Sequence, residues 1–349
     1  MHSGIAKGVK KHLPKVSIGM PVCNGENYIR EAIDSILAQT FEEFELVISD
    51  NASTDRTGEI CLEYAARDPR IKYVRNPVNI GAAKNYNATF DLSSGEYFKW
   101  AAHDDILDRN FLVACVKSLD KDPSVVVCFP EIVKIDDCGR QVGTYQEDNR
   151  IRVDSRKPHE RFRDLIDLRH WTISVFGLIR SEVLRKTPLI GSYVGSDRCL
   201  MAELCLFGPF HRIPEKLFFR RDHAGSSVEK FKLIQKRWGW FDPDKAGKIP
   251  FPHWRYVREY IISVRKSPLD LSEKIYCYLY TGRWFIKWRD RLWKDLTIAV
   301  RIAIERREMG HKMFEGIHEI RMAAKGLLQR SSLGRSVIEA RRHLLRRLR

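Results

Sequence analysis

Four short, mainly apolar runs occupy the first 105 residues, and each is followed directly by a polar loop. The runs cover Val16–Met20, Glu45–Ser49, Ile71–Arg75 and Glu96–Ala101. Between them, apolar residues recur at intervals of three and four, which is typical of amphipathic helices. Short strands alternating with helices pair through right-handed crossovers. The pattern therefore predicts an α/β fold with a mostly parallel, Rossmann-like sheet flanked by helices.

Polar residues gather immediately after these predicted strands. In parallel sheets, ligands bind at the carboxyl ends of the strands. The residues at this rim are, in chain order, Pro21, Asn24, Glu26, Asp50, Asn79, Gly81, Asp104 and Asp105. We expect them to line one binding site.

The second strand runs into Ser49-Asp50-Asn51-Ala52-Ser53-Thr54-Asp55. A carboxylate at this position can accept hydrogen bonds from ribose hydroxyls or from the N–H of a base. The alternative is that Asp50 and Asp55 only form a turn and the start of the next helix. We expect Asp50 to bind a nucleotide and Asp55 to cap the helix.

The fourth strand ends at His103-Asp104-Asp105. Adjacent carboxylates suit a hard divalent cation, which takes oxygen ligands and leaves room for two phosphates. Such an ion neutralises charge that builds on a leaving group. An acid-rich helix start is the alternative, because Asp108 and a helical pattern follow. Because Asp104 and Asp105 are predicted to share the rim with Asp50, metal binding is the favoured interpretation.

Three further candidates lie outside these two motifs. Gly81 opens a helix whose free N–H groups favour anions, and Lys84 adds a positive charge one turn later. Arg221 and His223 follow an apolar strand and can hold a diphosphate and a metal, although a solvated basic loop fits as well. Asp197 could take a proton from an acceptor hydroxyl. From spacing alone, it more simply caps the apolar helix that follows.

The positive charge is concentrated in the last part of the chain. The formal net charge is +16, with +3 in residues 1–254 and +13 in residues 255–349. An aromatic stripe with Lys and Arg between its members could lie in an anionic membrane surface or pack on the body. The stripe consists of Trp284, Phe285, Trp288, Leu292 and Trp293. For the Arg-rich end, Arg341–Arg349, membrane contact is expected.

The composition excludes several classes of protein. No run approaches the roughly 20 apolar residues that span a bilayer, and the first 15 residues lack the apolar block of a signal peptide. Eight scattered cysteines without a Cys-x-x-Cys pair predict reduced thiols rather than disulfides or a zinc site. We expect a cytoplasmic protein, with peripheral attachment to the inner face of the plasma membrane as a further option.

Three rival functions are weighed against these motifs. Nucleic-acid binding by the basic tail leaves the clustered carboxylates unexplained, because they repel phosphate backbones unless a metal intervenes. A dinucleotide-dependent oxidoreductase would carry Gly-x-Gly-x-x-Gly after the first strand, which is absent. A sugar nucleotidyltransferase would be expected to show a Gly-rich basic loop where this chain has Pro21–Glu26.

Taken in order, these motifs resemble those of family 2 glycosyltransferases of the GT-A fold, over about residues 14–230. The matching pieces are Val16–Glu26, Ser49–Asp55, Asn79-x-Gly81 and His103-Asp104-Asp105. Each piece alone is weak, but four in the correct order and spacing are specific. Asn51 stands where many members carry a second Asp, and His103 replaces the leading Asp of the metal triplet.

The resemblance implies a role for each candidate residue. Asp197 would be the general base of a single displacement that inverts the anomeric carbon. Asp105 and His223 would hold Mg²⁺ or Mn²⁺, with Asp104 facing the ribose. The nucleotide sugar would contact Pro21, Asn24, Glu26, Asp50, Asn79, Gly81, Lys84, Asp104 and Arg221.

The same resemblance implies the organisation and the activity. An extension (1–14) would precede a GT-A domain (15–240), with a nucleotide-binding half (15–110) and an acceptor half (111–240), and a basic helical tail (255–349) would follow. One sugar would pass from a nucleotide-diphosphate sugar to a hydroxyl of a glycan or lipid-linked acceptor, in polysaccharide, glycolipid or cell-envelope glycan synthesis. An anionic membrane surface would be met through residues 280–349, and no nucleic acid is expected.

Overall fold

The computed structural model describes residues 13–145, 150–168, 172–226, 234–245, 248 and 251–304. The chain divides into two compact units, Met1–Leu292 and Trp293–Arg349. The Arg-rich end predicted to touch a membrane lies outside the described residues.

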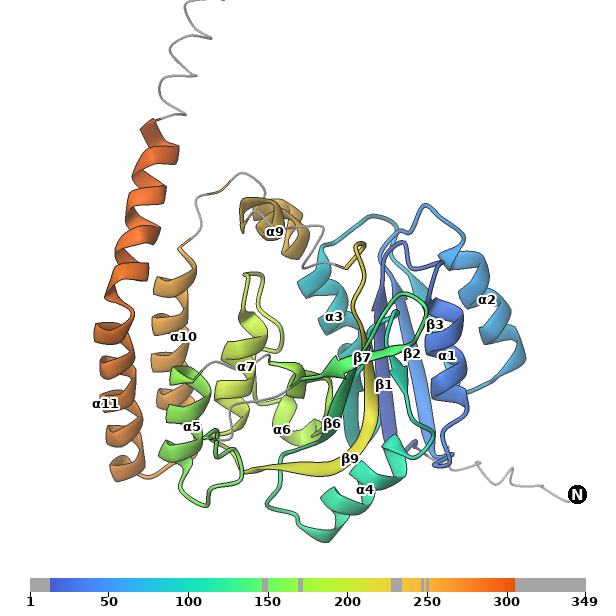
Figure 1. The fold of residues 1–349 in the computed structure, drawn as a ribbon, viewed down its shortest axis with the longest axis horizontal. Coiled ribbons are helices and arrows are strands. Elements are labelled where there is room, and N and C mark those ends of the chain that lie inside the picture. The colour runs from blue at the N-terminus through green and yellow to red at the C-terminus, as the bar shows by residue number, and fades with distance from the viewer. Residues whose placement is uncertain are drawn as a thin grey trace, which may run out of the picture. The chain divides into compact units, whose positions relative to one another are not determined.

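A mixed sheet forms the centre of the first unit (Figure 1). Its strands run in the order β3-β2-β1-β4-β8-β6-β9-β5, and β7 pairs with β6. Their bounds are β1 (Val16–Val22), β2 (Phe44–Asp50), β3 (Ile71–Arg75), β4 (Tyr97–Trp100), β5 (Ile106–Leu107), β6 (Val127–Ile135), β7 (Gln141–Thr144), β8 (Leu178–Arg180) and β9 (Phe210–Arg221).

The parallel half of the sheet is the half that the sequence predicts. Strand β1 pairs in parallel with β2 and β4, and β2 pairs in parallel with β3. All seven residues of β1 are buried, as expected for a strand covered on both faces. The carboxyl ends of these four strands therefore meet at one rim. The other half is mixed, because β8 runs antiparallel to both β4 and β6.

Helices cover both faces of the sheet and enclose two hydrophobic cores (Figure 1). The first core contains residues of α1 (Ile29–Leu37), α2 (Thr57–Arg67) and α4 (Phe111–Lys121). The second contains residues of α3 (Ala82–Asp91), α5 (Pro158–Asp167), α6 (Ser181–Leu184), α7 (Ser196–Leu204), α10 (Pro252–Lys266) and α11 (Leu271–Lys287). The chain therefore has the layered α/β architecture that the sequence predicts.

The aromatic stripe of the tail is divided between the body and the solvent. Trp284 is 5% exposed and packs edge-on against Tyr260 at 5.7 Å, while Leu292 is 2% exposed. Phe285 and Trp293 remain 38% and 65% exposed. Trp284 belongs to the second hydrophobic core, which includes residues of α3, α5 and α7, so packing on the body is the correct alternative for this residue. The division of the chain into a domain and a tail near residue 255 stays a prediction.

Two predictions, on the cysteines and on membrane-spanning segments, can be compared with the structure. All eight cysteines are free thiols, and most are buried. Among the described residues, every helix is too short or too polar to cross a lipid bilayer.

Glu203 joins the tail helices to the body. It is 5% exposed at the end of α7, and its carboxylate accepts a hydrogen bond from Ser263 of α10. Burial raises the pKa of Glu203 to about 7, although Ser263 and Lys266 oppose the rise. A buried carboxyl with a raised pKa stabilises the fold only while it holds its proton.

We predict that Glu203→Gln removes a pH-dependent loss of stability. The contribution of Glu203 is fully present below its unfolded pKa and is lost as the pH rises through about 7. Between pH 5 and 8.5, the free energy of unfolding of the wild type should fall by about 2–3 kcal/mol relative to Glu203→Gln. Urea unfolding at both pH values measures this, with exposed Glu182→Gln as the control; parallel pH profiles would contradict it.

Candidate functional site

Two loops at the rim are joined by reciprocal hydrogen bonds. The backbone N–H of Asn24 donates to Ser53 Oγ at 2.9 Å, and Thr54 N–H donates back to Asn24 Oδ1 at 2.8 Å. The Glu26 carboxylate accepts from Arg56 N–H, while Glu26 N–H donates to Asp55. The loop after β1 is therefore fixed to the loop after β2, and Asn24 adopts a positive φ of 56°.

Asp55 lies directly before Arg56, which is the N-cap of α2, so it is one position short of the cap that the sequence predicts. Its Oδ1 accepts a hydrogen bond from the N–H of Thr57, the first residue of that helix, at 3.0 Å. This bond satisfies one of the amides that a helix start leaves without a partner. It also lowers the pKa of Asp55, even though partial burial opposes the shift.

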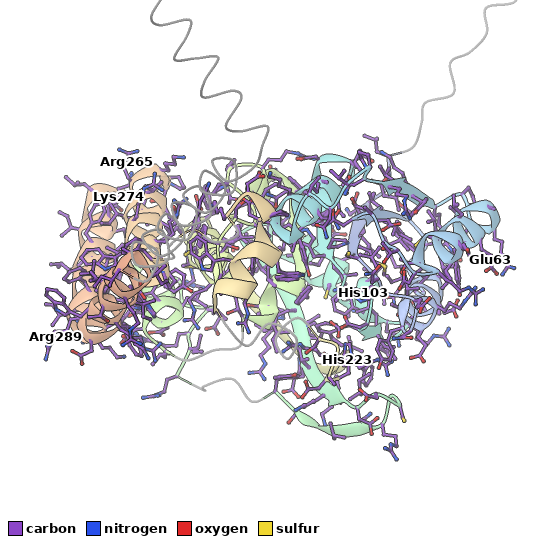
Figure 2. The ribbon with its side chains drawn as sticks, turned by 90° about the horizontal axis from the view of Figure 1, so that it is seen from above. Glu63, His103, His223, Arg265, Lys274 and Arg289 are labelled. Carbon is purple, nitrogen blue, oxygen red and sulfur yellow. The ribbon has the colours of Figure 1, made fainter. Side chains whose placement is uncertain are left out.

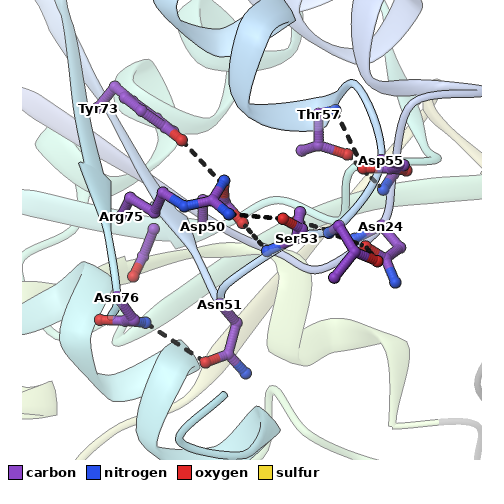
Figure 3. Close-up of polar contacts among 12 residues, drawn as sticks. Asn24, Asp50, Asn51, Ser53, Asp55, Thr57, Tyr73, Arg75 and Asn76 are labelled. Atoms are coloured by element: carbon purple, nitrogen blue, oxygen red, sulfur yellow. Dashed lines mark hydrogen bonds and ion pairs between the residues drawn. The ribbon is translucent and has the colours of Figure 1, made fainter. Parts of the chain in front are cut away.

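Asp50 is the fixed point beneath these loops (Figure 3). Its side chain is fully buried and accepts hydrogen bonds from Tyr73 Oη, Arg75 Nη1 and the N–H of Ser53, each at 2.8 Å. Burial and the Asp50 carboxylate together raise the pKa of Tyr73 to about 12. The carboxylate thus faces protein groups, and it orders the loop that would contact a nucleotide.

Asparagines connect the loops after β2 and β3. Asn51 donates to Asn79 Oδ1 at 2.9 Å and accepts from the N–H of Ile80. Asn85 in α3 exchanges hydrogen bonds with Ser49 and accepts one from Asn76. The sequence analysis did not single out Asn76 or Asn85. Their neutral amides can be buried at less cost than charges, provided that they are hydrogen-bonded.

The start of α3 is covered by a later segment of the chain. Gly81 has a φ of 86°, and a Cβ there would lie 2.6 Å from Pro243 Cδ and 2.7 Å from Phe241 O. The Lys84 ammonium pairs with Asp244 at 3.0 Å. The residues expected to attract an anion therefore contact the segment Phe241–Lys245.

Asp104 and Asp105 form an acidic pair in the loop that follows β4. Asp105 is 7% exposed and accepts a hydrogen bond from the backbone N–H of Arg221 at 2.9 Å. Burial and the charge of Asp104 raise the pKa of Asp105 to about 7. Burial also acts on Asp104, but a 2.9 Å hydrogen bond with His223 Nε2 keeps the pKa of Asp104 low. The environment therefore favours the charged form of Asp104 and the protonated form of Asp105.

Arg221 ties this pair to the rest of the rim. Its guanidinium is fully buried and donates to the carbonyl oxygens of Asp104, Asp136 and Asp137, and it pairs with Glu31 of α1. Its donors are thus directed at protein oxygens. His223, two residues after Arg221, packs edge-on against Tyr28, with the ring centroids 4.8 Å apart. Figure 2 labels both His223 and His103.

A third acid, Asp197, belongs to the same electrostatic cluster. Burial and the charges of Asp104, Asp105 and Asp197 together raise the pKa of Tyr86 in α3. Arg220 acts in the opposite direction on Tyr86, Asp105 and Asp197. Three carboxylates from two distant segments thus act electrostatically on one tyrosine, and Arg220 opposes them.

The sequence leaves two interpretations of Asp197, a helix cap and a general base, and the structure bears on the first. Helix α7 begins at Ser196 with Gly195 as its N-cap, and no side-chain cap bond is made. The cap assignment for Asp197 is therefore wrong, because the helix starts earlier than the apolar pattern indicated. Burial raises the pKa of Asp197, and the N–H of Arg198 donates to its Oδ1 at 2.9 Å.

The same acids are the candidate ligands for a metal ion. Within the part of the chain that the structure describes, no three His, Cys, Asp or Glu side chains form a ready metal site. The mutual repulsion of Asp104 and Asp105 nevertheless fits a cation, whose remaining ligands a diphosphate would supply.

Residues 17–187 match the family model described as glycosyl transferase family 2. These residues form a family 2 glycosyltransferase domain. An uncharacterized glycosyltransferase of Rickettsia typhi is 37% identical over 123 residues, which are 34% of this chain and 37% of that protein. Glycosyltransferase GlyA of Streptococcus pneumoniae is 34% identical over 105 residues, which are 30% of this chain and 15% of that protein. The chain therefore matches well under half the length of either relative.

Solved structures support the GT-A fold of the family 2 domain. S. aureus TarS 1–349 superimposes with a TM-score of 0.57 at 18% identity, covering 78% of this chain and 72% of that chain. At this identity the likeness concerns the fold. It agrees with the parallel half of the sheet and the helices on both faces.

The structure brings together several of the predicted residues. Asp104, Asp105 and Asp197 all act on Tyr86, and His223 forms a hydrogen bond with Asp104. Pro21 lies in β1 beside Ser49 of β2, next to the loops fixed by Asn24 and Asp50. Arg220 and Tyr86 are the members of the cluster that sequence reasoning missed. Arg220 could have been suspected, because it directly precedes Arg221 in the same motif.

We predict that Arg221→Lys destabilises the family 2 domain by about 2–4 kcal/mol, because one ammonium cannot replace a buried guanidinium that donates in several directions. The exposed Arg140 pairs with Asp136 at the surface, so Arg140→Lys should cost at most about 1 kcal/mol. Chemical unfolding of both variants measures the difference. Equal losses would show that Arg221 does not hold the rim together.

Proposed function

We propose that this protein is an inverting glycosyltransferase that moves one sugar from a nucleotide-diphosphate sugar to a hydroxyl acceptor. The observation that carries the proposal is that Asp104 and Asp105, which follow the parallel strand β4, and Asp197 of α7 all act electrostatically on the same residue, Tyr86. Donor and acceptor would meet there. The family 2 domain supports the reaction class, and glycan or cell-envelope glycan synthesis is the proposed setting.

The joined loops after β1, β2 and β3 are the proposed nucleoside site. Asn24, Glu26 and Asn79 shape these loops through backbone hydrogen bonds. Asp50 acts from below by fixing Ser53 and Arg75. Because TarS has been crystallised in complex with UDP-GlcNAc, uridine diphosphate sugars are the first donors to test.

Mg²⁺ or Mn²⁺ is the proposed cofactor, held by Asp105 and His223 beside Asp104. Bound there, the ion would neutralise charge on the leaving diphosphate. The residues of this chain supply the rest: Arg221 orients Asp105 through its backbone N–H, and Asp104 holds His223 in place.

Asp197 is the proposed general base, which accepts the proton of the acceptor hydroxyl. Its raised pKa brings it nearer to neutrality, which improves proton acceptance. It must be ionised to act, so the rate should fall on the acid side at a pH above the ordinary range of an aspartate. Arg220 limits the rise by favouring the charged form.

The rival functions account for less of the site. A nucleic-acid-binding tail gives no role to three converging carboxylates, which would repel phosphate backbones. A sugar nucleotidyltransferase would place a basic Gly-rich loop where Asn24, Gly25 and Glu26 form a turn fixed to the next loop.

We predict that one class of nucleotide diphosphate sugar raises the melting temperature of the full chain. A ligand at 100 times its Kd adds about 2.7 kcal/mol to the stability of the folded state. A panel of UDP-, GDP- and dTDP-sugars, each with and without Mn²⁺, identifies the class. Asp105→Asn should keep the hydrogen bond from Arg221 but lose the increment due to Mn²⁺. If no nucleotide changes the melting temperature, the proposal is overturned.

We predict that Asp197→Asn retains donor binding and lowers sugar transfer by about 10²–10⁴. The asparagine keeps the shape and the hydrogen bond from Arg198, but it cannot accept a proton. Donor binding is followed by thermal shift, and transfer by release of the nucleoside diphosphate in the presence of acceptor. Asp91→Asn, at the end of α3, is the matched control. Unchanged turnover in Asp197→Asn would remove Asp197 from the mechanism.

A further inference from the structure

The outer face of α11 carries an apolar stripe that none of the described residues of the first unit covers. Leu271, Ile275, Leu279 and Ile286 are 74%, 49%, 60% and 62% exposed. At 100° per residue they fall within an arc of roughly 80°. Gly282 lies in the same arc, and a Cβ there would meet nothing within 4 Å. The stripe is therefore open along the helix.

This stripe lies opposite the face that α11 buries. Cys277, Thr281 and Trp284 are the buried residues of the helix and pack on the body. They include Trp284, a member of the aromatic stripe for which membrane contact was one of the two alternatives. The unused apolar surface is thus a different set of residues, and both faces of α11 are apolar.

Basic side chains flank the stripe on both sides. Arg283 follows it on one side, and Lys274 lies on the other. Lys287 lies farther round the helix than Arg283 and pairs with Asp167 of α5 at 2.7 Å. Figure 2 shows Lys274 and Arg289 at the periphery of the molecule, far from His103. The acid Glu273 is turned inward, where it bonds His159. An apolar stripe between basic side chains is complementary to a surface that is apolar inside and anionic at its edge.

A second copy of the chain fits this face less well. A symmetric pair would bring the same surface from both partners together. Arg283 and Lys274 would then oppose their own copies, and like charges repel. In the second unit, taken by itself, Trp293, Val300 and Ile304 are also more than half exposed. Their helical residues 293–304 include Lys294 and Arg301, which repeats the combination of apolar and basic residues.

We propose that the outer face of α11 docks on an anionic phospholipid surface. Leu271, Ile275, Leu279 and Ile286 enter the boundary between headgroups and acyl chains, and the flanking basic residues contact lipid phosphates. This proposal does not depend on the sugar-transfer reaction.

Cosedimentation of the full chain with vesicles tests the proposal. The vesicles contain phosphatidylcholine with 30 mol% phosphatidylglycerol, or phosphatidylcholine alone. Leu279→Asp removes one apolar contact and adds a repelling charge, so partition into the anionic vesicles should fall at least tenfold. Arg283→Ser should lower it about fivefold. The matched control is Leu62→Asp on α2, since Leu62 is 59% exposed, and its partition should equal that of the wild type.

The outcomes separate the alternatives. Binding to anionic vesicles that Leu279→Asp and Ile286→Asp both reduce, at unchanged melting temperature, supports the proposal. It is overturned if the wild type stays in the supernatant, if Leu279→Asp binds as well as the wild type, or if neutral vesicles bind equally. A dimer of the wild type that Leu279→Asp dissociates, measured by light scattering, would assign the face to a second copy and also overturn it.

Discussion

The site depends on one buried guanidinium. Arg221 ends β9, and its side chain donates to carbonyl oxygens of Asp104, Asp136 and Asp137 and pairs with Glu31 of α1. Its backbone N–H orients Asp105. A charge without exposure is tolerated only when its donors are satisfied. The end of β4, the turn after β6 and the start of α1 are therefore held in one arrangement.

That arrangement concentrates negative charge in a place where water is scarce. Burial, together with the charge of Asp104, raises the pKa of Asp105 to about 7. His223 and Arg220 compensate this charge only in part. Folding tolerates such a cluster at a stability cost, and the cluster favours ligands that bring a cation. The asparagine network beside it adds hydrogen bonds without adding charge.

The features that were predicted correctly are those that depend on residues close together in the sequence. The strand ends, the position of Asp55 next to a helix start and the acidic pair all follow from neighbours within a few residues. Contacts between distant segments could not be predicted in this way. Lys84 pairs with Asp244, and Arg221 with Glu31, across 160 and 190 positions. The aromatic stripe was ambiguous for the same reason, because periodicity shows that Trp284 is on an apolar face but not which body covers it.

The helix that carries Asp197 is also the helix on which the tail packs. Helix α7 carries Asp197 in its first turn and Glu203 in its last, Glu203 bonds Ser263 of α10, and α10 packs against α11. Closely packed helices hold one another in place, because a protein interior leaves little free space between side chains. The outer face of α11 is thus held at a fixed orientation relative to Asp197. If both proposals hold, a lipid surface bound by α11 would present an acceptor embedded in it at a constant angle to the base.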